Sequence, residues 1–220
     1  MFKDIIDELK MVLKGKTLDT ILPPILFVLF YSFFSLTIAL WVSLVSGGFV
    51  FMWRLISKTT VSYAFFGLLG VLIAFLFAFI SGNATNYYLP SIITSAFLIV
   101  IMFGSILLRR PLALWLSHLT RAFPLNWYKR HDILPAYQEV TIGWLVLLLL
   151  RFFILLGLFL DGDLMRYALF NIILGFPVTL LVLILTYVYG LWRLNQLNGP
   201  SVDEYKRQVP PPWQSQKKGF

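Results

Sequence analysis

Residues 144–157 read WLVLLLLRFFILLG, and this stretch decides the fold class. Thirteen of its fourteen residues are uncharged and mostly large and apolar, and the single charge is that of Arg151. It lies within an apolar run over 140–160. An α-helix rises about 1.5 Å per residue, so about 20 such residues cross the roughly 30 Å hydrocarbon core of a bilayer. We therefore predict an all-α integral membrane protein.

The composition of the whole chain agrees with this prediction. Of its 220 residues, 59% are hydrophobic and only 13% are charged, about half the charged share of a soluble domain. The absence of cysteine excludes disulfides, thiolate catalysis and cysteine-ligated metals. The net charge of +8 fits basic loops that face anionic lipid headgroups, and we expect no nucleic-acid partner.

Six apolar segments organise a membrane domain over 20–192. The first uncharged run, Thr20–Trp53, would be about 50 Å long as one helix, which exceeds an ordinary span. It is either one long tilted helix or a hairpin of two short helices, 20–33 and 36–54, that turns near YSFFSLT. The later predicted spans are 61–80, 89–108, 140–160 and 167–190, the last interrupted by Gly175 and Pro177.

The placement of charge favours the hairpin. With six spans and both termini cytoplasmic, 16 of the 18 Lys and Arg residues fall inside, Arg166 falls outside and Arg151 stays at membrane depth. Cytoplasmic loops are enriched in Lys and Arg. A single first span would instead put the basic residues before Thr20 on the opposite side from Arg54 and Lys58. We therefore predict a multi-pass plasma-membrane protein with cytoplasmic N- and C-termini.

Three polar segments flank or interrupt the spans. Segment 1–19 is predicted to form an amphipathic helix on the membrane surface, over 2–13. The cytoplasmic loop 109–139 is predicted to hold a second interfacial helix at about 111–123. Segment 193–220 is polar and is predicted to be a disordered cytoplasmic tail.

The predicted helix at 111–123 combines two kinds of side chain. Its apolar stripe comprises Leu112, Trp115, Leu116, Leu119 and Phe123. The cations around it form a predicted basic cytoplasmic face: Arg109, Arg110, Arg121, Lys129 and Arg130. We expect this face to bind anionic phospholipid.

Arg151 raises the main functional question. A cation in hydrocarbon costs roughly 2.5–3.5 kcal/mol on insertion scales, so Arg151 should face the bundle interior or a polar cavity. No Asp or Glu lies inside a predicted span. Three interpretations stay open: structural bonding to carbonyls and hydroxyls, bidentate binding of an anion or lipid phosphate, or snorkelling to an interface. Candidate hydroxyl partners are Ser43, Ser46 and Thr179.

Signatures of catalysis are missing from the sequence. There is no phosphate-binding glycine loop, nucleophile elbow or zinc motif, and we expect no catalytic residues, metal or cofactor. Asp161 and Asp163 either cap the sixth span or bind a cation, capping being the default. Gly67 and Gly70 share one face of the third span, which leaves a homo-oligomer open.

Several motifs resemble a bacterial integral membrane family of unknown function. They are ILPPILFVLFY (21–31), YLPSIITSAF (88–97) leading into LLRRPLALWL (107–116), the tryptophan-to-Arg151 pattern of the fifth span, and GFPVTLLVL (175–183). That family is typical of high-GC Gram-positive bacteria and is similar in layout to the intracellular septation protein A family. The resemblance covers roughly residues 20–195 and carries no catalytic residues.

Two function classes follow from these observations. The resemblance implies a plasma-membrane helical protein tied to cell-envelope synthesis or division, here a non-enzymatic component with envelope or division proteins as partners. The rival is a small transporter or lipid-handling protein with an anion site at Arg151.

Overall fold

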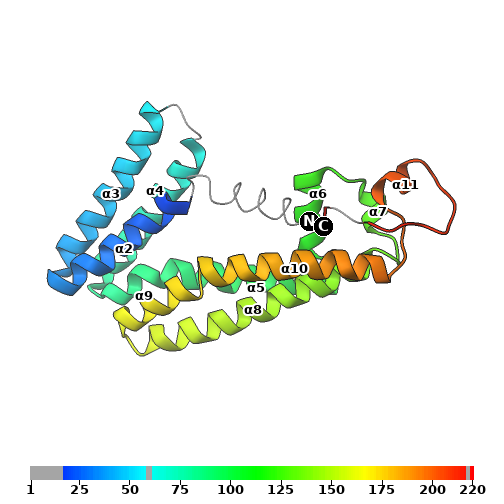
Figure 1. Cartoon of the computed structure of the whole chain (residues 1–220). Helices are drawn as coiled ribbons and strands as arrows, with labels where there is room; N and C mark the ends of the chain where they lie inside the picture. Colours follow the sequence, from blue (N-terminus) through cyan, green and yellow to red (C-terminus); the bar gives the residue numbers. More distant parts are fainter. Residues whose placement is uncertain (1–16, 58–60, 217–218) are drawn as a thin grey trace. The chain divides into compact units, whose positions relative to one another are not determined.

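The computed structural model describes residues 17–57, 61–216 and 219–220, in which every regular element is a helix. The helix predicted at 2–13 lies outside the described residues. The elements shown in Figure 1 are α2 (Thr17–Phe33), α3 (Leu36–Ile56), α4 (Val61–Ser81), the 3-10 helix η1 (Ala84–Tyr88), α5 (Leu89–Leu107), α6 (Leu112–Arg121), α7 (Leu125–Tyr128), α8 (Leu134–Leu160), α9 (Leu164–Ile173), α10 (Phe176–Gln196) and α11 (Val202–Lys206).

Within the described residues, four helical segments are long and apolar enough to cross a membrane: Leu36–Ile56, Ala84–Leu107, Leu134–Leu160 and Leu164–Gln196. Each matches one of the predicted spans. Shorter apolar segments occur within α2 and α4, at Leu22–Phe33 and Phe65–Ser81. Large apolar side chains also lie on the outside of these helices, among them Val45, Phe49 and Ile80. An apolar exterior of this kind is what helices in contact with lipid require.

The first uncharged run is two helices and not one. α2 ends at Phe33 and α3 begins at Leu36, with Ser35 in an extended conformation between them. This confirms the predicted break near YSFFSLT. α2 and α3 pack against each other, and both pack against α4.

The described residues form two compact units, and α5, α8 and α9 each contribute to both. Unit 1 takes its described residues from 17–94 and 154–171. Its core uses small side chains on α3 and α4, because these let helix backbones approach closely. Gly47 is one of them, and a Cβ there would touch Leu68 and Val71 of α4. Gly47 therefore allows α3 and α4 to pack closely.

Unit 2 takes its residues from 95–153 and 172–220. Within it, α10 runs beside α8 in the opposite direction (Figure 1). Glu139, near the start of α8, accepts hydrogen bonds from Arg193 near the end of α10, with Nε–Oε2 at 2.8 Å and Nη2–Oε1 at 2.8 Å. The Tyr189 hydroxyl donates to the same carboxylate at 2.7 Å. This cluster fixes the register between the two helices.

Two boundaries differ from those predicted. α8 begins at Leu134, six residues before the predicted start of the fifth span, with Pro135 in its first turn, where the missing N–H costs nothing. The sixth span is interrupted at residues 174–175, because α9 ends at Ile173 and α10 starts at Phe176. Pro177 therefore lies in the first turn of a new helix, and the predicted interruption at Gly175 is confirmed.

The polar end of the chain has defined contacts where the sequence predicts disorder. α10 continues to Gln196, and a short α11 follows behind a capping box formed by Ser201 and Glu204. The main-chain nitrogen of Val202 then donates to Gln216 Oε1 at 3.0 Å. These bonds hold the segment after α11 against α11 itself.

Candidate functional site

The strongest candidate site begins where α5 ends. The nitrogen of Arg109 donates to the oxygen of Ile106 at 3.0 Å, and that of Arg110 donates to the oxygen of Ser105 at 2.9 Å. These two bonds form a Schellman motif, in which glycine is the usual residue at the left-handed position. Here Arg109 takes that position, with φ of 52°. A non-glycine residue in this conformation is strained by about 1–2 kcal/mol.

α6 follows at once and presents an apolar face outward. Trp115, Leu116 and Leu119 are 38%, 61% and 77% exposed. The opposite face buries Leu114 and Ser117. We call Arg109, Arg110 and the three exposed apolar residues the basic corner. Of the predicted apolar stripe, Leu112 is half-buried and Phe123 packs into the core beneath α6, so only its middle part faces outward.

An aromatic core packs against the buried face of α6. We call it the aromatic cap; its buried members are Leu114, Trp127, Tyr128, Ile133, Ala136, Tyr137, Leu194 and Val202. Trp127 Nε1 donates to the oxygen of Pro200 at 2.8 Å, and the Tyr128 hydroxyl donates to Ser117 Oγ at 2.9 Å. Burial of the Tyr128 phenol raises its pKa above the ordinary value, so it stays a neutral donor.

The remaining predicted cations differ in their surroundings. Lys129 is exposed. Arg130 forms a two-pronged ion pair with Asp132, at 2.8 and 2.7 Å, and its guanidinium lies 5.0 Å from the ring centre of Trp213. The hydrogen bond to Asp132 raises the pKa of Arg130 further above its ordinary value. Arg121 Nε donates to the main-chain oxygen of Phe220 at 3.0 Å. Arg109, Arg110 and Lys129 are thus the exposed members of the predicted basic face.

The residues predicted around an anion lie in different units. Ser43 and Ser46 belong to unit 1, where Ser43 Oγ and the Tyr87 hydroxyl lie 2.6 Å apart and Ser46 Oγ donates to the oxygen of Ser43 at 2.7 Å. Arg151 and Thr179 belong to unit 2. Arg151 is half-buried on α8 with its Nε fully buried, whereas Thr179 is exposed in the first turns of α10. A shared anion site of these four residues stays a prediction.

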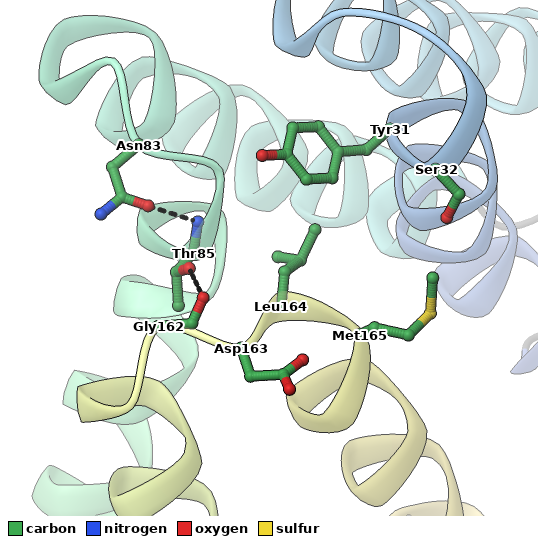
Figure 2. Close-up of a pocket in the computed structure, with 8 residues that line it drawn as sticks. All are labelled: Tyr31, Ser32, Asn83, Thr85, Gly162, Asp163, Leu164 and Met165. Atoms are coloured by element: carbon green, nitrogen blue, oxygen red, sulfur yellow. Dashed lines mark hydrogen bonds between the residues drawn. The ribbon is translucent and has the colours of Figure 1, made fainter.

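Unit 1 contains a pocket of about 400 Å³ that sequence reasoning did not identify. Figure 2 shows Tyr31 and Ser32 of α2 on one side, with the turn before η1 and the turn before α9 on the other. Two of the polar residues that line it, Asn83 and Thr85, form hydrogen bonds with main-chain groups. Asn83 Oδ1 accepts from the nitrogen of Thr85 at 2.9 Å, and Thr85 Oγ1 donates to the oxygen of Gly162 at 3.3 Å.

Asp163 completes the pocket and caps α9. Its Oδ1 accepts from the nitrogen of Arg166 at 3.0 Å, and its Oδ2 lies 3.1 Å from Arg166 Nε. This confirms the predicted capping role of the LDGDL turn. Among the described residues, no group of three His, Asp or Glu side chains could hold a metal ion.

Comparisons with known proteins place this chain in a family but not beside a characterised relative. No curated protein and no solved structure matches it significantly. A family described as "Protein of unknown function (DUF3159)" matches residues 15–194, which include α2 to α9, most of α10, the basic corner and most of the aromatic cap. The chain belongs to this family of unknown function.

Proposed function

We propose that the chain is a six-span protein of a bacterial plasma membrane, with both termini in the cytoplasm, whose basic corner binds anionic phospholipid. The distribution of Lys and Arg supports this orientation, since a six-span arrangement would put 16 of the 18 on one side. The orientation puts the basic corner and the aromatic cap at the cytoplasmic leaflet. That surface is negatively charged and attracts basic segments by about 1 kcal/mol per cation.

The chemistry of the basic corner suits a lipid headgroup. The planar guanidinium groups of Arg109 and Arg110 can each bind a phosphate through two parallel hydrogen bonds. Beside them, Leu116 and Leu119 are exposed apolar side chains that can enter the acyl region. Trp115 is half-exposed on the same face, and tryptophan favours the headgroup level of a bilayer. The basic corner thus combines cations that can bind the phosphate with apolar side chains that can contact the acyl chains.

The observation that carries the proposal is the conformation of Arg109. Its left-handed backbone would be relaxed with glycine, yet an arginine is present and exposed. Strained backbone positions persist where the surrounding structure over-determines them, and they cluster at functional sites. The role proposed for this one is to present a cation to a lipid phosphate.

We further propose a non-enzymatic role in the cell envelope or in division, with envelope or division proteins as partners. The motive for this assignment is the resemblance of the sequence motifs to a bacterial family similar in layout to the intracellular septation protein A family. Affinity purification of the protein from its membrane should recover such partners, and recovery of none would argue against the role.

The lipid proposal can be tested with a variant that removes charge without adding strain. In Arg109→Gly/Arg110→Gln, glycine relaxes the Schellman position, so weaker binding would not reflect misfolding. We expect retention of phosphatidylglycerol over phosphatidylcholine to fall about fivefold for each cation removed, or about thirtyfold for both. Native mass spectrometry of the protein from micelles with equal amounts of the two lipids gives this ratio.

The matched control is Lys206→Gln/Arg207→Gln, which removes two adjacent exposed cations at α11. It lowers net charge by the same amount and should leave the lipid ratio within about twofold of the wild-type value. Equal losses in both double variants would show a general charge effect and would refute a site at the basic corner.

A second candidate function is anion handling at Arg151, as in a small transporter or lipid-handling protein. The observation in its favour is the burial of the Arg151 Nε in the apolar helix α8. Leu160 ends this helix nine residues later, about 14 Å along the axis, which is a long way for an arginine to snorkel.

This candidate predicts that an anion stabilises the protein through Arg151. Inorganic phosphate or a short-chain phosphatidylglycerol, at a concentration about a hundred times its Kd, should raise the wild-type Tm by roughly 5–10 °C. Arg151→Leu should abolish this shift, whereas Arg166→Leu, which removes an exposed arginine, should retain it. Absence of a shift in the wild type, or an equal shift in Arg151→Leu, would assign Arg151 a structural role.

A further inference from the structure

A groove in unit 2 holds the last described residues of the chain. Gly219 and Phe220 lie against α6, α8 and α10, and the Phe220 ring packs on the aromatic cap. The Phe220 and Tyr137 rings are stacked, with their centres 4.4 Å apart and their planes 8° from parallel. This contact covers one face of a fully buried tyrosine of α8.

The shape of α10 makes room for that ring. Gly190 is buried, and a Cβ at this position would lie 2.5 Å from the Cδ2 and Cε2 atoms of Phe220. Real Cβ contacts are not this short, so any side chain at 190 would push Phe220 out. Glycine in a helix interior is unfavourable by about 1 kcal/mol relative to alanine. The need for space beside the Phe220 ring therefore explains why residue 190 is glycine, although glycine is unfavourable in a helix.

The groove also binds the main chain of its occupant. Arg121 Nε donates to the Phe220 oxygen at 3.0 Å, and the Gly219 nitrogen donates to the Tyr187 hydroxyl at 3.4 Å. Gly219 has φ of +77°, and a Cβ there would lie 3.1 Å from Arg121 Nη1. The site therefore favours both residues of the Gly–Phe pair. The backbone conformation and the limited space favour glycine at 219, and the notch at Gly190 accommodates the aromatic ring at 220.

Other contacts of the same segment are made with α11 and with the loop before α8. The Gln214 nitrogen donates to Glu204 Oε1 at 2.8 Å, and Trp213 lies against Arg130. They do not involve the groove at Gly190. Removing the Phe220 ring should therefore empty the notch and leave α11 in place.

We propose that this groove is a docking site for a peptide segment with a glycine–aromatic pair, and that the chain's own Gly219–Phe220 occupies it as a latch. A tethered occupant has an effective concentration in the millimolar range, so it fills the site without high intrinsic affinity. A separate peptide of the same chemistry binds when the latch residue is removed. The inference does not depend on lipid binding.

The experiment uses the full chain with Phe220→Ala and a synthetic peptide of residues 209–220. The peptide carries a benzophenone amino acid in place of Phe220. Its C-terminus is amidated, so that Arg121 meets a neutral main-chain oxygen and not a free carboxylate. After illumination, we expect cross-links at Tyr137 and around Gly190, located by mass spectrometry. Labelling of the wild type should be at least about tenfold weaker, because its own tail fills the groove.

Two further variants, made in the Phe220→Ala background, keep the proposal falsifiable. Gly190→Val fills the notch and should abolish labelling, whereas Gly157→Val, at a glycine with open space around it, should not. Arg121→Gln removes the guanidinium and should lower labelling without altering the core. The proposal is overturned if wild type and Phe220→Ala label equally, or if neither Gly190→Val nor Arg121→Gln reduces labelling.

Discussion

Trp127→Ala should lower the free energy of unfolding by about 3–5 kcal/mol, the largest loss we expect from any single substitution in unit 2. Trp127 is fully buried at the centre of the aromatic cap. Its ring meets those of Tyr128, Phe123 and Tyr137 edge to face, at centre distances of 5.0, 5.9 and 6.4 Å. Truncation would leave a cavity and an unpaired oxygen on Pro200.

Trp192 provides a matched control on α10. It is 53% exposed, so Trp192→Ala should change the free energy of unfolding by no more than about 0.5 kcal/mol. Trp127→Phe separates packing from hydrogen bonding, because it keeps an aromatic ring and loses the donor to Pro200, at about 1–3 kcal/mol. Unfolding in detergent, followed by helix content, measures all three variants. Similar losses at Trp127 and Trp192 would show that the cap is not a stabilising core.

Gly199→Ala should be the second most damaging of these changes, at about 1–3 kcal/mol. A Cβ at 199 would lie 2.8 Å from the main-chain oxygen of Asp132 and 2.8 Å from Ile133 Cδ1. The Ile133 side chain can rotate away, but the Asp132 backbone is held where its carboxylate binds Arg130. The clash therefore separates the segment after α10 from the loop before α8.

Gly143→Ala is the control for this effect. Gly143 lies in α8, and the space that an alanine methyl group would take there is open, so alanine should be neutral or should stabilise the helix by up to about 1 kcal/mol. Thermal unfolding of the two variants should therefore shift in opposite directions or differ by several degrees. If Gly199→Ala is as stable as Gly143→Ala, the approach of residue 199 to the Asp132 loop is looser than described.

Helix positions were largely predictable because apolar runs of about 20 residues have few alternatives in a membrane protein. The break between α2 and α3 followed from charge, since only a hairpin keeps Arg54 on the same side as the N-terminal cations. The start of α8 was missed because Pro135, Gln138 and Glu139 look like a loop. Tertiary structure explains the helix there, because Arg193 and Tyr189 bind the Glu139 carboxylate.

The aromatic cap could not be found from the sequence. Its defining bond joins Trp127 to Pro200, which are 73 positions apart, and no local pattern signals such a contact. The cluster of Trp127, Tyr128 and Tyr137 was the only available hint. The same limit applies to the chain end, because polar, proline-rich composition predicts disorder, whereas Phe220 is held by Arg121, Tyr137 and Gly190, all far away in the sequence.

The basic cytoplasmic face at the end of α5 stays a prediction, and its local geometry could not be predicted. The sequence does not reveal the backbone conformation of Arg109, because it depends on the bonds that close α5.

That conformation makes Arg109 a position where two selections should disagree. In a library of all substitutions at residue 109, sorting for thermal resistance should enrich glycine above the native arginine. Sorting the same library for growth that depends on the protein should enrich arginine and deplete glycine. A residue that lowers thermal stability but raises growth is retained by selection for function. Arg109 is the position in the described chain where we expect this reversal to be clearest.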